Sequence, residues 1–110
     1  MDIETRNLKH VTVVKPVGRV DSATAPELEK MLQGLLDADR SQIVIDLQET
    51  NYMGSAGLRV LVAMQKSARK SGGALRLTQL TTRIKEVFEL AGLTSVFDIY
   101  PDIVEAVGSF

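Results

Sequence analysis

One segment in the middle of the chain constrains the fold more than any other. The compact apolar run from Gln42 to Leu47 is typical of a strand that is buried on both faces. A polar loop over residues 49–54 follows, and a helical pattern of apolar residues begins at Ser55. Because a buried strand that leads directly into a helix is the building unit of parallel sheets, the chain is predicted to be an α/β protein.

The rest of the chain alternates between strands and helices with short connections. Two opening strands are predicted to pair as a hairpin, and two later strands and three further helices follow. The expected strands cover residues 3–8, 10–17, 42–47, around 75–77 and 96–100, and the expected helices cover residues 24–36, 55–71, 84–91 and 102–107. The prediction is one domain of residues 1–110, with a mixed, mostly parallel sheet of about five strands and about four helices.

Three local signals refine this outline. Pro16 falls late in the second strand, which favours an edge position, a bulge or the end of the strand. Thr24 followed by Glu27 three residues later is a capping-box pattern at the start of the first helix. Gly92 followed by Leu93 is typical of a Schellman ending to the third helix.

Composition excludes several classes of function. The net charge is −1, with 13 basic and 14 acidic residues, so no overall field favours nucleic acid or an acidic membrane. Cysteine is absent and the only histidine, His10, has no companions, so neither thiolate catalysis nor a metal site is expected. With no export signal and no apolar run near the roughly 20 residues that cross a bilayer, a cytoplasmic protein without a cofactor is predicted.

The hydroxyl of Ser55 is the strongest candidate for chemistry. It is predicted to cap the second helix, with its oxygen facing the N–H groups of Gly57 and Leu58. Helix N-termini favour negative charge, so backbone dipoles could hold a phosphoryl group on this serine. A hydrolase nucleophile would need glycine where Met53 stands and a histidine downstream. Ser55 is therefore interpreted as a switch, and no enzyme activity is expected.

Two loops are expected to meet at one edge of the sheet. Residues 18–22 follow the second strand and residues 49–54 follow the third, and the carboxyl ends of parallel strands share an edge. Asp21 and Ser55 are then neighbours. Asp21 is interpreted either as an exposed side chain or as a second cap for the first helix.

The second helix carries two further patterns. Its first half is apolar nearly all round, so it is either covered on two sides or exposes a patch for a partner. The residues of this half are Leu58, Val60, Leu61, Val62, Ala63 and Met64. Four basic residues lie mostly on one side of the helix and indicate a solvated face or, alternatively, a contact with an anion or an acidic partner. They are Arg59, Lys66, Arg69 and Lys70.

Several motifs together resemble the STAS domain family, specifically the stand-alone bacterial anti-sigma factor antagonists. They are Gly18-Arg-Val-Asp21-Ser-Ala-Thr, Ile45-Asp-Leu47, Tyr52-Met-Gly-Ser55-Ala-Gly-Leu58, Gly72-Gly-Ala-Leu-Arg-Leu77 and the apolar positions between Ile84 and Leu93. The similarity covers essentially the whole chain in the family's order of elements. It implies the STAS fold, and each residue role below is carried over from this resemblance.

The resemblance implies a switch that works by exchange of partners. An unphosphorylated antagonist binds an anti-sigma factor that is also a serine kinase, and so frees a sigma factor. The kinase then phosphorylates a serine, which corresponds to Ser55, and a metal-dependent serine phosphatase resets the protein. The expected partner surface joins the two loops to the start of the second helix. It comprises Asp21, Ser22, Thr24, Met53, Gly54, Ser55, Ala56, Gly57 and Arg59.

One position departs from the family pattern. Gly54 stands where an aspartate usually precedes the serine, which removes a carboxylate from beside the hydroxyl. Glycine also permits a positive φ, which an aspartate would tolerate poorly. An alternative function is therefore an unphosphorylated STAS adaptor subunit of a transporter or of a larger signalling assembly.

Overall fold

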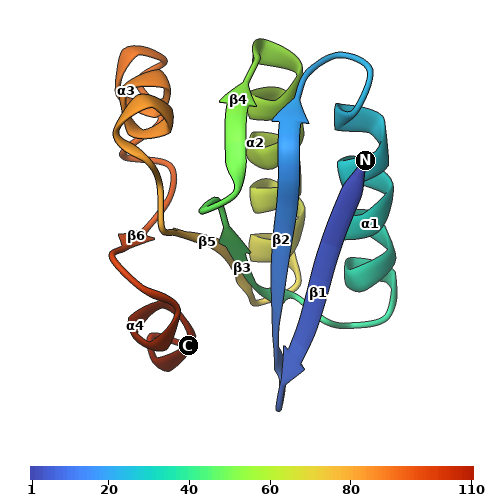
Figure 1. The fold of residues 1–110 in the computed structure, drawn as a ribbon. Coiled ribbons are helices and arrows are strands. Elements are labelled where there is room, and N and C mark those ends of the chain that lie inside the picture. The colour runs from blue at the N-terminus through green and yellow to red at the C-terminus, as the bar shows by residue number, and fades with distance from the viewer.

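Two antiparallel strands open the chain in the computed structural model, which describes residues 1–110 (Figure 1). They are β1 (Asp2–Leu8) and β2 (Val11–Val20). The later elements are α1 (Ala25–Asp37), β3 (Gln42–Asp46), β4 (Thr50–Met53), α2 (Ser55–Lys70), β5 (Ala74–Thr78), α3 (Thr82–Leu90), β6 (Ile99–Tyr100) and α4 (Ile103–Gly108). No helix combines the length and the apolar character that a membrane-crossing segment requires.

All strand pairs after the opening hairpin are parallel. The sheet runs in the order β1-β2-β3-β5-β6, and β4 pairs with β2 beyond the end of β3. The predicted mixed, mostly parallel sheet with four helices is therefore confirmed. The expected loop at residues 49–54 is wrong in part, because residues 50–53 form a sixth strand. The last strand is shorter than predicted and covers only residues 99–100.

Strand β2 changes its neighbour halfway along its length. Residues 11–14 pair with β3, whereas residues 18–20 pair with β4. Pro16 lies between these two stretches, so it has no partner on that side of β2, and on the other side it lies opposite Ile3 of β1. Its carbonyl oxygen accepts a hydrogen bond from the hydroxyl of Thr50 at 3.1 Å. Of the three sequence alternatives for Pro16, the strand's end is wrong because β2 continues to Val20. A break in pairing holds instead, since β2 has neither β3 nor β4 beside it at Pro16 and its register against β4 shifts between Gly18 and Arg19.

The two faces of the sheet carry cores of different size. Successive strand residues point to opposite faces, so Val14 and Ile45 join one cluster while Val13 and Val44 join the other. The larger cluster has 18 buried residues and includes side chains of α1, α2 and α3. The smaller one has 4 buried residues and is closed by Ala106 of α4. The strand that was predicted to be buried on both faces is confirmed as such.

Glycines end two of the helices where the sequence places them. Gly72 follows α2 with a φ of +84° and Gly92 follows α3 with a φ of +71°. The N–H of Gly92 donates to Glu89 at 3.0 Å, and that of Leu93 donates to Phe88 at 2.9 Å. These two hydrogen bonds are the Schellman pattern, so that prediction is confirmed.

Candidate functional site

Strands β2 and β4 end side by side, at the top of Figure 1. Val20 pairs with Met53, and the N–H of Gly54 donates to the carbonyl oxygen of Val20 at 2.9 Å. The loops that carry Asp21 and Ser55 therefore leave the sheet from the same edge, as predicted. This edge positions the starts of both α1 and α2.

The start of α1 is held by a network of polar side chains. The carboxylate of Asp21 accepts hydrogen bonds from the N–H groups of Ala23 at 3.0 Å and Thr24 at 3.1 Å. The hydroxyl of Thr24 donates to the carbonyl oxygen of Arg19 at 2.8 Å and accepts from the N–H of Asp21 at 2.9 Å. The predicted capping role of Thr24 is wrong, because its side chain caps no N–H group of α1. Asp21 is the acceptor at this turn.

These contacts also fix the charge of Asp21. The N–H of Thr24 above all, together with the N–H of Ala23, the Thr24 hydroxyl and the nearby Arg19, holds the pKa of Asp21 below its ordinary value of 3.8. The side chain remains 31% exposed. Asp21 therefore stabilises the turn before α1 and still presents its negative charge to solvent, and its role in binding a partner stays a prediction.

The start of α2 has no comparable network. Ser55 is the first helical residue and Gly54 is the N-cap, and no side chain caps this end. The prediction that Ser55 is the cap is wrong, because the carbonyl oxygen of Gly54 already accepts the first helical hydrogen bond, from Leu58 at 3.1 Å. The side chain of Ser55 is exposed. Its hydroxyl is left available for modification.

Two glycines shape this edge in different ways. A Cβ on Gly57 would lie 2.5 Å from the sulfur of Met53 and 2.6 Å from Cγ1 of Val20, so glycine lets α2 begin directly against the strands. A Cβ on Gly54 would lie 3.1 Å from Cε2 of Tyr52. Gly54 has a φ of −91°, so the alternative that it holds a positive φ is wrong.

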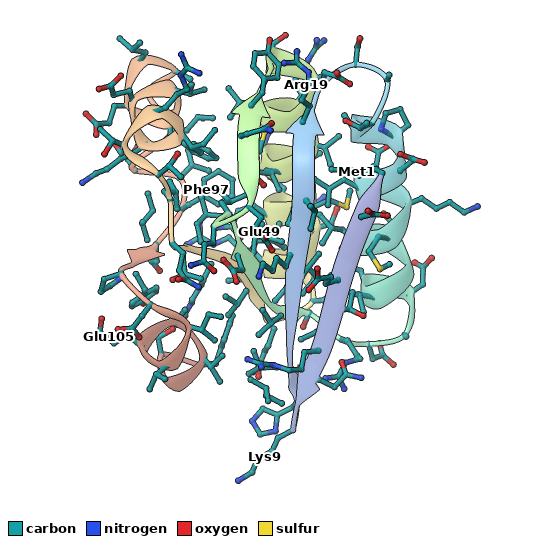
Figure 2. All side chains as sticks on the ribbon, viewed as in Figure 1. Met1, Lys9, Arg19, Glu49, Phe97 and Glu105 are labelled. Carbon is teal, nitrogen blue, oxygen red and sulfur yellow. The ribbon has the colours of Figure 1, made fainter.

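An aromatic and cationic pair covers Gly54. The guanidinium of Arg19 lies 4.1 Å from the ring centre of Tyr52, a cation–π contact, and its Nε lies 3.5 Å from Oδ2 of Asp21. Figure 2 shows Arg19 at the edge where β2 and β4 end. Neither Arg19 nor Tyr52 was among the predicted site residues, although both are exposed there. Burial along β4 does not alternate, since only Thr50 and Met53 are buried, so no local pattern in the sequence indicates the exposed ring of Tyr52.

Seven of the nine expected surface residues reach the surface. Exposed or half-buried are Asp21, Ser22, Thr24, Gly54, Ser55, Ala56 and Arg59. Met53 and Gly57 are buried, so their place in the partner surface is corrected: they support it from below.

The apolar first half of α2 is divided between the core and the surface. Val60, Leu61 and Met64 are buried, whereas Leu58 and Val62 are only half-buried. The latter two line an open groove of about 790 Å³ that begins at Ser55. The groove is lined by Glu29, Ser55, Leu58, Arg59, Val60, Val62, Ala63, Lys66, Ala91 and Leu93. Part of this half is therefore buried and part is exposed apolar surface, and a partner for the exposed part stays a prediction.

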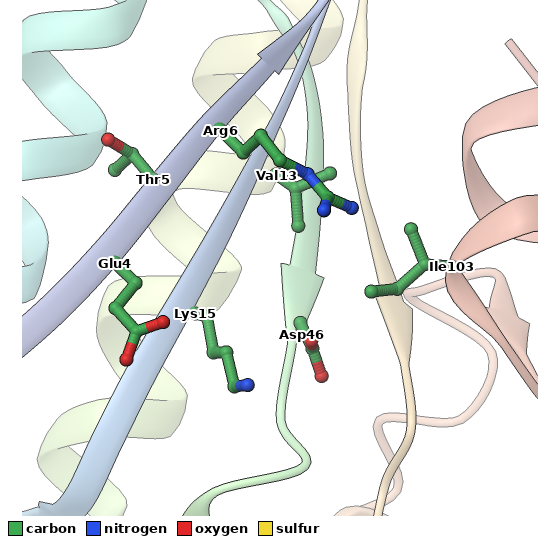
Figure 3. A pocket seen from close by; sticks show the side chains of 7 residues that line it. All are labelled: Glu4, Thr5, Arg6, Val13, Lys15, Asp46 and Ile103. Carbon is green, nitrogen blue, oxygen red and sulfur yellow. The ribbon is translucent and has the colours of Figure 1, made fainter.

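A second hollow lies on the sheet face near α4 and is mostly polar (Figure 3). Its lining comprises Glu4, Thr5, Arg6, Val13, Lys15, Asp46 and Ile103. Lys15 forms an ion pair with Glu49 at 2.9 Å, and this contact raises the pKa of Lys15 above 10.5. No group of three or more ligating side chains could hold a metal ion. The charged lining residues are two acidic and two basic, so the hollow selects no single charge, and the edge with Ser55 is taken as the candidate site.

Comparisons with known proteins show which family and which proteins this chain is similar to. The STAS domain family matches residues 2–106. The chain is 37% identical to BtrV of Bordetella bronchiseptica, over 84% of this chain and 80% of that one. It is 32% identical to the anti-sigma-B factor antagonist of Listeria monocytogenes, over 90% of this chain and 86% of that one.

A solved structure extends the similarity to three dimensions. An anti-sigma factor antagonist from Mycobacterium paratuberculosis superposes with a TM-score of 0.89 at 27% identity, covering 98% of this chain and 92% of that one.

Proposed function

The chain belongs to the STAS domain family, and from that premise we propose that it is an anti-sigma factor antagonist switched by phosphorylation of Ser55. Its relatives are named for a regulatory binding role, not for catalysis. The observation that carries the proposal is the uncapped start of α2, where an exposed serine hydroxyl stands at a helix N-terminus.

In the unphosphorylated state, the shared edge binds an anti-sigma factor of the serine kinase type and so frees a sigma factor. The small residues Gly54 and Ala56 leave the Ser55 side chain accessible to a partner. Asp21 and Arg59 supply one charge of each sign at the same edge of the sheet. The protein acts in the cytoplasm, and it needs no cofactor.

Phosphorylation reverses this binding for electrostatic reasons. A phosphoryl group adds about −1.5 to −2 charges at neutral pH, which the N-terminus of α2 tolerates when it faces water. Inside a packed interface the same charge is desolvated and repelled by Asp21, whose lowered pKa keeps it ionised. A loss of about 3 kcal/mol weakens binding by roughly a hundredfold. A metal-dependent serine phosphatase restores the binding form.

One observation favours a second candidate. Residue 54 is glycine, so no carboxylate stands directly before Ser55 to guide a kinase, and the ring of Tyr52 occupies the space beside it. A STAS adaptor that binds its partner in a transporter or signalling assembly without phosphorylation is the alternative.

Incubation with ATP and a kinase-type anti-sigma factor from the same organism separates the two. The antagonist role predicts a mass increase of one phosphoryl group, mapped to Ser55 and absent from Ser55→Ala. Modification of Ser22, Ser41 or Ser67 instead would refute the assignment of Ser55. A wild-type chain that binds the kinase tightly but stays unmodified would favour the adaptor.

A further inference from the structure

The groove on α2 continues the candidate site away from the sheet edge. Ser55 lies at one end and Lys66 lies eleven residues further along the same helix. At 1.5 Å per residue this separation is about 16 Å, or three helical turns. Ala91 and Leu93, which follow α3, and Glu29 of α1 complete the lining.

The floor of this groove is apolar surface that the fold does not use. Leu58 and Val62 pack only partly against the core, and Ala63 is exposed. The walls come from helices and from the turn after α3, and no strand edge opens into the groove. An added strand would therefore find no backbone groups to pair with, whereas a helix can lay its apolar face on such a floor.

The charges beside the groove restrict the occupant further. Arg59 and Lys66 lie on the α2 side and Glu29 lies on the α1 side. The three ion pairs of the structure join Met1 to Glu27, Lys15 to Glu49 and Arg19 to Asp21. Arg59, Lys66 and Glu29 are thus uncompensated, and a complementary occupant is acidic along α2 and basic opposite Glu29.

We propose that the groove binds an amphipathic helix of the anti-sigma factor, with acidic side chains directed at Arg59 and Lys66. The inference rests on the proposed function for the identity of the partner, and it adds the kind of segment that the partner supplies. It also extends the switch. A phosphoryl group on Ser55 would stand at the end of the groove and repel the acidic face of the bound helix.

Two substitutions and one matched control test the groove. Ala63→Glu places a long acidic side chain on the exposed floor, and Lys66→Glu reverses one of the two cations. Arg69→Glu makes the same charge reversal on the same helix at an exposed position outside the groove. All three positions accept glutamate in a helix, and circular dichroism confirms the fold of each variant.

Titration calorimetry against the anti-sigma factor gives the readout. We expect Ala63→Glu and Lys66→Glu to weaken binding by about tenfold or more, which corresponds to about 1.4 kcal/mol, and Arg69→Glu to change it less than about twofold. Exchange of an acidic residue for lysine in the partner helix should restore binding to Lys66→Glu.

The outcomes separate this inference from the function on which it rests. Wild-type affinity in both groove variants overturns the inference, and the proposed function stands if Ser55→Asp still weakens binding. Equal losses in Lys66→Glu and Arg69→Glu also overturn it, because the effect is then one of net charge. A wild-type chain that does not bind the anti-sigma factor overturns both.

Discussion

Helices α1 and α2 begin at the same edge of the sheet but are fixed by different means. The start of α1 depends on polar side chains, since Asp21 and Thr24 hydrogen bond to the backbone on either side of the turn. The start of α2 depends on shape, since Gly57 allows close packing on Val20 and Met53 and no side chain caps the helix. Because the start of α2 does not depend on a side-chain hydrogen bond, a change at Ser55 need not disrupt the fold, whereas a change at Asp21 or Thr24 removes such bonds.

Gly57→Ala should have the largest effect on stability, because it disturbs the packing of α2 against the strands. The new methyl group would come within 2.6 Å of Val20, a fully buried side chain that cannot move away freely. We expect a loss of about 1–3 kcal/mol in the free energy of unfolding, measured by urea denaturation.

Gly34→Ala is the matched control for this substitution. Gly34 lies in α1, and nothing is within 4 Å of the position that its Cβ would occupy. The same added methyl group should stabilise the protein there by about 0.5–1 kcal/mol, because alanine favours helix more than glycine does. Equal effects at the two positions would show that packing does not fix the start of α2.

Asp21→Ala tests the polar side of the comparison. The N–H groups of Ala23 and Thr24 lose their acceptor, so the melting temperature should fall. Asp21→Asn keeps an acceptor oxygen at the same place and should recover much of the loss. An alanine variant that melts like the wild type would show that the network is dispensable and that Asp21 serves only the surface.

Gly54→Asp would make the two helix starts more alike. The φ of −91° suits aspartate, and a carboxylate at the N-cap can accept the free N–H groups of α2. The ring of Tyr52 must shift to admit it, so we expect a net change within about 1 kcal/mol. If a carboxylate helps the kinase, the phosphorylation rate rises. A large fall in the melting temperature would show that the ring of Tyr52 cannot move to make room for the aspartate side chain.

The pH dependence of stability should reveal the polar network at the start of α1, because only that helix start depends on an ionised side chain. The folded pKa of Asp21 is below 3.8, so its contribution is fully present above that value and is lost as the pH falls through the lowered pKa. The stability difference between wild type and Asp21→Asn should therefore shrink below about pH 4. A difference that stays constant on acidification would contradict the cause assigned to this shift.

Ser55→Ala should have the smallest effect on stability. The hydroxyl caps no N–H group, so the change in the free energy of unfolding should stay within about 0.5 kcal/mol. Thermal melts measure this change. A fall of more than about 1 kcal/mol in the free energy of unfolding would indicate that the Ser55 hydroxyl caps α2 after all.

Periodicity predicted most of the fold, and the misses have local causes. Continuous apolar positions predict the strand at residues 42–46, and apolar positions at helical spacing predict α2. Strand β4 has only four residues, and only its first and last are buried, so it presents no such pattern.

The site was predicted less completely, because some of its contacts depend on tertiary pairing. Arg19 meets Tyr52 only because β2 extends past Pro16 to pair with β4, which no local pattern indicates. The cap of α2 was misplaced by one residue, since Gly54 offers its carbonyl oxygen and has no side chain to reveal the role.

The change of neighbour along β2 has a consequence for local unfolding. β4 is joined to the sheet by three register pairs with β2 and has no other strand partner, whereas β3 is paired on both sides. Opening β4 therefore breaks few hydrogen bonds, and it leaves the pairs that hold β3 intact. We therefore expect β4, the strand that leads into Ser55, to open at a lower cost in free energy than β3, with the burial of Thr50 and Met53 as the main resistance to that opening.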